Sequence, residues 1–338
     1  TGELDYSDVL LNQMDRVRVV SAKIIACDSN EVALLGPTSL GLSLVANGIE
    51  WKSGDEVITY LDDYPANVYP WKHLEKQGVK VVYLKPALTG EITPELVRRA
   101  ITPKTRLLAL ASCHFLSGYR LDIEAIGTLA KERDLLFCLD AIQTVGAFPT
   151  PAGLVDFLCA DSHKWMLGPM TAGIFYVAKK RQEHLHPSLL GAWNVKSPNF
   201  IAQDKVDFEP GGRRYEPGVL NAQGLVGMEA SLELLTGIGI ESISKRLLEL
   251  KTQLITGIQE LGFEVIGPQN GSSASSITSV TDLVNPRRIP ELYDTLAQNQ
   301  IVVSFRHDRK GTPFVRFSPH FYNTSTEIEQ ILDILRKA

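Results

Sequence analysis

The sequence predicts an α/β fold in which a mostly parallel central sheet is flanked by helices and followed by a smaller C-terminal α+β domain. Two observations support this prediction. Short runs of β-branched and aliphatic residues recur in the first half of the chain, and segments with helical periodicity lie between several of them. Strands that are apolar throughout and are joined by helices are typical of parallel sheets covered on both faces.

The apolar runs are the predicted strands of the central sheet. They lie at residues 56–61, 79–84, 106–111, 135–140, 156–160 and 173–177. Two of the helices between them carry start signals: Thr93 is a suitable N-cap with Pro94 at the first helical position, and Asp122 can cap the helix that follows it. Another helical run begins at about residue 40.

The second half of the chain has a different pattern. Residues 181–222 are rich in proline, glycine and asparagine, so we expect long ordered loops there. Predicted helices and strands then follow at residues 223–235, 240–261, 263–267, 301–305, 313–318 and 326–337. We therefore predict a large domain over residues 1–222 and a small domain over residues 223–338.

The composition limits the possible partners. The chain has 338 residues, of which 44% are hydrophobic, and a net charge of -5. Basic and acidic residues are mixed along it, so no surface for nucleic acid or anionic membrane is expected. No apolar run approaches the roughly 20 residues that span a bilayer, and the first residues lack the features of a signal peptide. We predict a cytoplasmic protein that acts on a small molecule.

The four cysteines form no CxxC pair. Cys113, Cys138 and Cys159 fall in apolar runs and are predicted to be reduced and buried. Cys27 lies in a more polar stretch, and its state is left open. No metal site is predicted, because the histidines lack partners at ligand spacing.

Polar residues follow the apolar runs, where open α/β sheets bind their ligands. Asp140 ends one run, Gln143 follows it, and Lys164 comes shortly after the next run. Thr38 and Ser39 precede a helical run, where free N–H groups would stabilise a phosphate. Each feature alone also fits a solvated lysine or a helix cap. Together they are what pyridoxal-phosphate chemistry requires.

The segment DSHKWMLGP, residues 161–169, resembles the cofactor-lysine segment of class V aminotransferases. This fold-type I pyridoxal-phosphate family also contains cysteine desulfurases, kynureninases and isopenicillin N epimerase. Four further segments resemble the family: DDYPANVYPW, LDAIQTVGAF, RRYEPGVLNAQG and VRFSPHFYNT. The five segments occur in the family's order and cover the chain from about residue 36 to its end.

The resemblance implies a role for each polar residue. Lys164 would form a Schiff base with the cofactor and move protons at the substrate α-carbon. Asp140 would keep the pyridine nitrogen protonated, and Gln143 would hydrogen-bond the ring hydroxyl. Tyr64 matches the aromatic position that stacks on the ring. Arg316 matches the arginine that binds the substrate carboxylate.

The family's phosphate-binding positions are matched by Thr38, Ser39 and His163. Asp161 stands where many relatives have serine or threonine, so we expect either Ser162 to replace that hydroxyl or Asp161 to turn outward. Val219 stands where a threonine commonly reaches the phosphate of the neighbouring subunit. Only 35 residues precede Gly36, so the N-terminal segment is expected to be shorter than is usual in the family.

The leading functional hypothesis is a pyridoxal-phosphate enzyme that acts at the α-carbon of a small amino acid, most simply an aminotransferase. The alternatives are a β-lyase acting on cysteine or cystine, an epimerase, and a non-catalytic protein with the same fold. The loop before VRFSPH has no cysteine, which argues against a desulfurase of the usual kind. The resemblance also implies a homodimer in which residues 181–222 cross between subunits.

Overall fold

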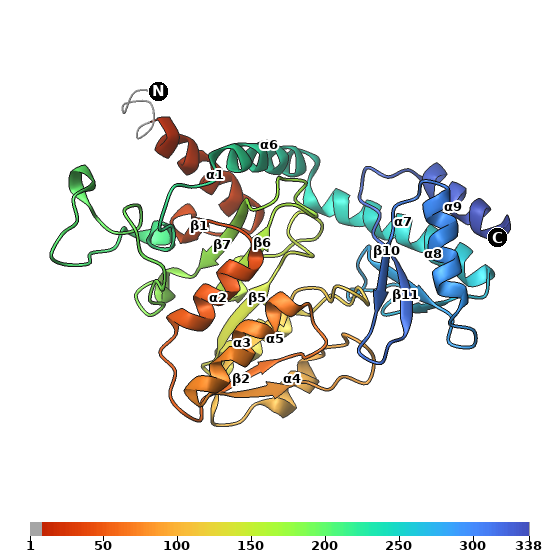
Figure 1. Ribbon diagram of the computed structural model, residues 1–338, viewed down its shortest axis with the longest axis horizontal. Coiled ribbons are helices and arrows are strands. Elements are labelled where there is room, and N and C mark those ends of the chain that lie inside the picture. Colours follow the sequence, from red (N-terminus) through yellow and green to blue (C-terminus); the bar gives the residue numbers. More distant parts are fainter. Residues whose placement is uncertain (1–8, 338) are drawn as a thin grey trace.

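The computed structural model describes residues 9–337, which form two sheets with their own helices (Figure 1). The first sheet has the strand order β1-β7-β6-β5-β4-β2-β3. Its strands are β1 (Val32–Leu34), β2 (Glu56–Thr59), β3 (Lys80–Tyr83), β4 (Thr105–Ala111), β5 (Leu136–Asp140), β6 (Phe157–Asp161) and β7 (Gly173–Val177). The run from β3 to β6 is parallel, whereas β7 is antiparallel to both of its neighbours. The predicted α/β class is confirmed.

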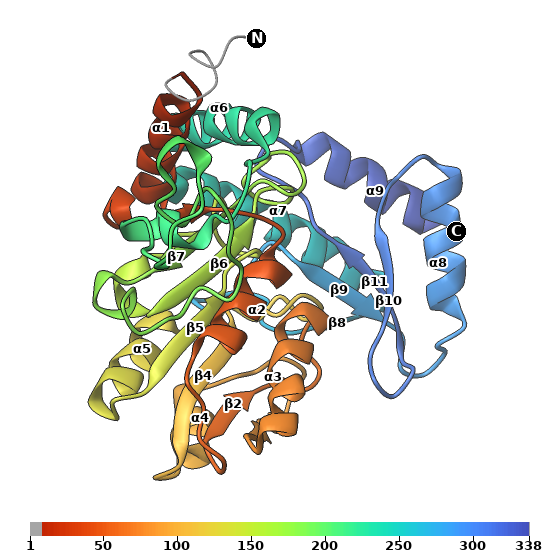
Figure 2. The same cartoon turned by 60° about the vertical axis from the view of Figure 1, so that its left-hand side comes forward.

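Helices cover both faces of this sheet (Figure 2). Alternate strand residues point to opposite faces, so Leu139 packs into one core and Cys138 into the other. The first core includes residues of α1 (Leu10–Ile24), α4 (Pro94–Ala100), α5 (Ile123–Glu132) and α6 (Ala222–Ile238). The second core includes residues of α2 (Thr38–Gly48) and α3 (Tyr69–His73).

The second sheet is antiparallel, with the strand order β10-β11-β9-β8. Its strands are β8 (Glu264–Ile266), β9 (Thr278–Thr281), β10 (Ser304–His307) and β11 (Pro313–Phe317). One face packs on α7 (Ile240–Glu260), α8 (Arg288–Gln298) and α9 (Ser325–Lys337). Helix α6, which opens the small domain in our prediction, packs against α1, and α7 leads to the second sheet. The domain division stays a prediction.

Local sequence signals account for the helix starts. The Thr93 hydroxyl accepts a hydrogen bond from the Leu96 N–H at 3.2 Å, and the Asp122 carboxylate accepts one from the Ala125 N–H at 2.9 Å, so both predicted caps are confirmed. The predicted strand at 301–305 begins only at Ser304 and continues to His307. Helices α1, α3 and α8 and strands β1 and β9 were not predicted.

The burial of three cysteines is confirmed: Cys113, Cys138 and Cys159 are buried and free. Cys27 is half-buried, and burial raises the pKa of its thiol to about 12. No helix within residues 9–337 combines the length and apolar character that crossing a bilayer requires.

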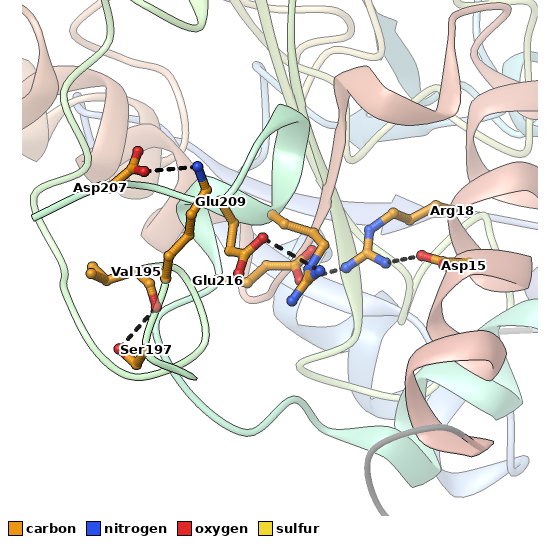
Figure 3. A network of polar contacts seen from close by, with 9 residues as sticks. Asp15, Arg18, Val195, Ser197, Asp207, Glu209 and Glu216 are labelled. Carbon is orange, nitrogen blue, oxygen red and sulfur yellow. Dashed lines mark hydrogen bonds and ion pairs between the residues drawn. The ribbon is translucent and has the colours of Figure 1, made fainter. Parts of the chain in front are cut away.

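A buried ion pair holds the segment before α6 against α1 and β1 (Figure 3). The Arg18 guanidinium lies 2.5 Å from the Glu216 carboxylate, and both side chains are almost fully buried. Glu216 also accepts a hydrogen bond from the Leu34 N–H at 2.7 Å, and Arg18 pairs with Asp15 at 2.7 Å. Because β1 leads directly into α2, this network helps to fix where α2 begins.

We expect Glu216→Gln to lower the free energy of unfolding by about 3 kcal/mol, because it leaves the buried Arg18 charge without its main partner. The Glu209→Gln variant is the matched control, since Glu209 forms only a longer, partly exposed pair with Arg213 at 3.6 Å and should cost under about 1 kcal/mol. Urea unfolding of both variants measures the difference. Equal losses would show that the buried pair has no special role.

Candidate active site

The candidate site lies at the carboxyl ends of neighbouring parallel strands. Asp140 is the last residue of β5 and Asp161 the last residue of β6, and these strands pair side by side. Lys164 follows β6, Tyr64 lies in the connection after β2, and Phe115 lies in the connection after β4. The structure therefore brings these segments to one edge of the sheet, where the sequence predicted a ligand site.

The Lys164 ammonium lies over an aromatic ring in a half-buried position. Its nitrogen is 5.5 Å from the centroid of the Tyr64 ring, and that ring packs edge-on against Phe115 with the ring centroids 5.7 Å apart. Burial lowers the pKa of Lys164, and the charges of Arg316 and Arg306 lower it further against the opposing effect of Asp140. A lysine with a lowered pKa has more of the neutral, nucleophilic amine.

Asp140 is buried, with 4% of its surface exposed. Burial raises its pKa to about 7, and the nearby Asp63 carboxylate adds to this shift, whereas Lys164 opposes it. Asp63 is itself buried, and burial raises its pKa to about 6. Its carboxylate accepts hydrogen bonds from the Tyr64 N–H at 2.7 Å and from Asn67 at 3.1 Å. Asp63 was not among the predicted site residues, although it too follows an apolar strand.

Gln143 is held in one orientation by Trp165. The indole N–H donates to Gln143 Oε1 at 3.0 Å, so the NH₂ end of the amide points the other way. His320 lies against Trp165 with the ring centroids 5.1 Å apart. Burial lowers the pKa of His320 to about 4, and its neutral ring donates from Nε2 to the Trp165 carbonyl at 3.2 Å because Nδ1 accepts from the Phe321 N–H. This contact ties the lysine segment to the C-terminal part of the chain.

Thr38 and Ser39, the residues of the predicted anion site, lie at the N-terminus of α2. Thr38 is the first residue of this helix, and its oxygen accepts a hydrogen bond from the Asp161 N–H at 2.9 Å, which leaves the hydroxyl proton available. Ser39 follows, and together with Tyr64 it lines a groove of about 530 Å³. The positive end of the helix dipole and its free N–H groups favour an anion here.

Neither predicted accommodation at position 161 is observed. Asp161 is 3% exposed, so it does not turn outward. Ser162 donates its hydroxyl proton to the Pro169 carbonyl at 2.8 Å, so that proton is committed to its own turn. Asp161 instead lies 2.5 Å from His163 Nδ1 and accepts a hydrogen bond from the Thr171 N–H. The carboxylate thus faces the histidine.

Asp161 is also crowded on its other side. Its Oδ1 atom is buried and has no hydrogen-bond partner within residues 9–337. A Cβ atom on Gly36 would lie 2.7 Å from this oxygen and 2.8 Å from the Thr171 carbonyl carbon, so glycine is required at that close approach. His163 uses Nδ1 for Asp161, which leaves Nε2 to face a ligand.

Arg316 extends from β11 toward the first sheet. Its guanidinium donates to the Phe115 carbonyl at 2.7 Å and lies 3.5 Å from the Ser304 hydroxyl, while its Nε atom has no partner within the described chain. Burial lowers its pKa to about 10, and the neighbouring Arg306 charge acts in the same direction. A guanidinium held by neutral partners only is suited to binding a carboxylate.

Other residues near the site were missed. The missed residues come from segments that are distant in the sequence and meet Lys164 or its neighbours only in the folded chain: Phe115, His320 and Arg306. Nothing in the sequence around each of them indicates a role in the site. Val219, which lacks the hydroxyl of the threonine that is common at this position, is 65% exposed on the segment before α6.

Comparisons with known proteins agree on one family. The Aminotransferase class-V pattern matches residues 4–331. The chain is 28% identical to a probable cysteine desulfurase of Methanothermobacter thermautotrophicus, with 100% of this chain and 87% of the relative aligned. It is 26% identical to an uncharacterized aminotransferase of Bacillus subtilis, with 92% and 80% aligned.

Solved structures share the fold. The apo cysteine desulfurase of Thermococcus onnurineus superposes with a TM-score of 0.90 at 23% identity, over 98% of this chain and 84% of that one. A cystine C-S lyase solved with its product cysteine persulfide superposes with a TM-score of 0.88 at 18% identity, over 99% and 88%.

Proposed function

Because this chain belongs to the class V aminotransferase family, we propose that it is a pyridoxal-phosphate enzyme that cleaves the carbon–sulfur bond of a small amino acid without a cysteine nucleophile of its own. The family assignment covers nearly the whole chain. The relatives and neighbours named as desulfurases or as a cystine lyase support carbon–sulfur chemistry, and the cysteine positions favour a lyase over a desulfurase.

The observation that carries this proposal is the absence of a usable thiol. The chain has only four cysteines, of which three are buried, and the fourth, Cys27, follows α1, packs against the first core and has its pKa raised to about 12 by burial. Burial raises the pKa of the Cys113 thiol to about 11. A cysteine that forms a persulfide must be an exposed thiolate. Because the chain offers none, we infer that the cleaved sulfur leaves in a product formed from the substrate itself, as hydrogen sulfide or as a persulfide.

The residues present fit pyridoxal phosphate. The helix terminus at Thr38 offers donors for a phosphate, Tyr64 offers a ring face beside Lys164, and Asp140 offers a buried carboxylate for a cationic ring nitrogen. When bound, the cofactor supplies an electron sink for the substrate α-carbon. The Asp161 carboxylate, whose Oδ1 atom has no partner within residues 9–337, repels an anion, and the contact of its Oδ2 atom with His163 Nδ1 offsets part of this repulsion.

The side chains then have distinct tasks. Arg316 holds the substrate carboxylate and so orients the α-carbon. Lys164, with its lowered pKa, takes the α-proton and can return it to the leaving sulfur. Asp140 keeps the ring nitrogen protonated, and the Gln143 amide can donate a hydrogen bond to the ring hydroxyl.

The net reaction balances without an added oxidant. Cysteine and water would give pyruvate, ammonia and hydrogen sulfide. Cystine and water would give pyruvate, ammonia and cysteine persulfide, because the second sulfur leaves with the first. In both cases the carbon–sulfur bond breaks, the sulfur takes a proton, and the remaining three-carbon unit is hydrolysed.

Product analysis tests this function. We expect purified, cofactor-loaded protein to release pyruvate and ammonia from cystine or cysteine in equal amounts and without an amino acceptor. Alanine as the product would indicate a desulfurase and would contradict our proposal. A reaction that requires an added keto acid and releases no ammonia would also contradict it.

An aminotransferase is the second candidate. The similarity to the uncharacterized aminotransferase of Bacillus subtilis favours it, and it uses the same lysine and electron sink. We also propose a homodimer, which is supported by exposed apolar side chains in the loop-rich segment before α6, namely Leu190, Phe200, Ile201 and Val206.

A further inference from the structure

Two arginines share one face of the small sheet. Arg316 on β11 pairs with Ser304 on β10, and Arg306 lies two residues further along β10. Paired residues and alternate residues of one strand point to the same face, so Arg306 and Arg316 project together. The opposite face, with Phe305 and Val315, packs into the core formed with α7, α8 and α9.

The β10–β11 hairpin lies beside the loops of the first sheet (Figure 1), and two contacts anchor it there. On one side Arg316 donates to the Phe115 carbonyl at 2.7 Å. At the tip, Arg309 pairs with the Asp62 side chain. Arg306 lies between these two anchors along the hairpin, so its side chain faces the loops that carry the candidate site.

Neither arginine of this pair has a carboxylate partner within residues 9–337. Arg316 contacts a carbonyl and a hydroxyl, and Arg306 donates only to the carbonyl of Phe305 at 2.8 Å. Their charges act on the site, since both lower the pKa of Lys164. Arg309 differs, because Asp62 already neutralises it.

Three positive groups therefore converge on the site, and one substrate carboxylate can neutralise only one arginine. A site with two unpaired guanidinium groups favours a ligand that carries two anionic groups. We propose that Arg306 determines specificity by binding an acidic group on the substrate side chain. This inference rests on the proposed use of Arg316 for the α-carboxylate.

The predicted substrate class is thus a small amino acid whose side chain ends in an anionic group. Cystine carries a second carboxylate, and cysteine sulfinate carries a sulfinate on its sulfur. Both offer a guanidinium two anionic acceptor oxygens on a single atom. Cysteine itself lacks a second acceptor group of this kind.

Binding of two simple acids to the cofactor-loaded protein tests this inference without turnover. Succinate has two carboxylates and propionate has one, at a similar chain length. We expect calorimetric titration to show succinate binding about tenfold more tightly than propionate, the effect of one added charge-assisted hydrogen bond. Arg306→Gln should reduce this preference to about twofold or less while propionate binding stays unchanged.

Lys310→Gln is the matched control, since it removes a positive charge from the same hairpin and should keep the preference. Equal binding of the two acids to the wild type would overturn the inference. An equal loss of succinate and propionate binding in Arg306→Gln would overturn it too. That result would mean that Arg306 attracts any anion through its charge and does not bind the second carboxylate.

A kinetic comparison identifies the anion. In Arg306→Gln we expect kcat/KM to fall about tenfold for cystine, or the inhibition constant of cysteine sulfinate to rise about tenfold, whereas kcat/KM for cysteine stays unchanged. The compound whose constant changes carries the recognised group, and no change for either would contradict the inference. If the proposed lyase reaction fails while succinate still binds through Arg306, the substrate class holds and the reaction assignment alone is wrong.

Discussion

Replacing Lys164 by alanine is expected to lower kcat by about 10⁴-fold or more, because in our proposal this one side chain provides both the covalent link to the cofactor and the proton transfer at the α-carbon. Burial and two arginine charges lower the pKa of this lysine, and no other lysine lies over the Tyr64 ring within residues 9–337. The measurement is the rate of pyruvate release at saturating substrate.

Two variants control this experiment. Lys164→Arg keeps the positive charge but cannot form the link, so we expect it to be as inactive as Lys164→Ala. Lys72→Ala removes an exposed lysine of α3 and should keep wild-type activity. Borohydride reduction of the wild type should fix the cofactor to the peptide that contains Lys164. Full activity in Lys164→Ala would falsify our assignment of this residue.

The central sheet could be predicted because its signals are local. The run at 173–177 coincides with β7, and the run at 135–140 matches β5 within one residue. These strands are buried on both faces, so their apolar composition is unmistakable. Strand β1 was missed because it has only three residues, and its pairing with β7 joins segments about 140 positions apart.

The candidate site was predictable where residue type and position coincide. Asp140 ends a strand and Lys164 follows one, and the motif around each is specific. The direction of a buried side chain was not predictable: the Asp161 carboxylate points inward to His163 at 2.5 Å, because Gly36 leaves room for it. Asp63 shifts the pKa of Asp140, and Arg306 shifts that of Lys164, although each pair is far apart in the sequence. No sequence spacing predicts such electrostatic effects.

Asp140→Asn is expected to lower kcat by about 10²- to 10³-fold, the loss seen when one electrostatic partner of a reacting group is removed. Asparagine keeps the size of the side chain and its hydrogen bond from the Ile142 N–H can persist, but the amide cannot keep a ring nitrogen protonated. Pyruvate release measures this loss, and near-normal activity would exclude Asp140 as the partner of the nitrogen.

The same substitution should change how stability depends on pH in the cofactor-free protein. The pKa of Asp140 is raised from 3.8 to about 7 in the fold, mainly by burial. Between these values the folded state holds a proton that the unfolded state has lost, so raising the pH favours unfolding. Between pH 4 and 7, the free energy of unfolding of the wild type should therefore fall by up to about 4 kcal/mol because of this group.

Urea unfolding at several pH values separates this effect from the other carboxylates. In Asp140→Asn, the fall in unfolding free energy with rising pH should lose the part that extends to about pH 7. In Asp63→Asn, it should lose a narrower part that ends near pH 6. Because the Asp63 charge contributes to the raised pKa of Asp140, its removal should also shift the Asp140 transition to lower pH. Saturation with cofactor should weaken the slope, since a cationic ring nitrogen favours the ionised carboxylate. An unchanged slope in Asp140→Asn would show that Asp140 is already ionised without the cofactor, and the buried carboxylate would then be ready for the nitrogen before binding.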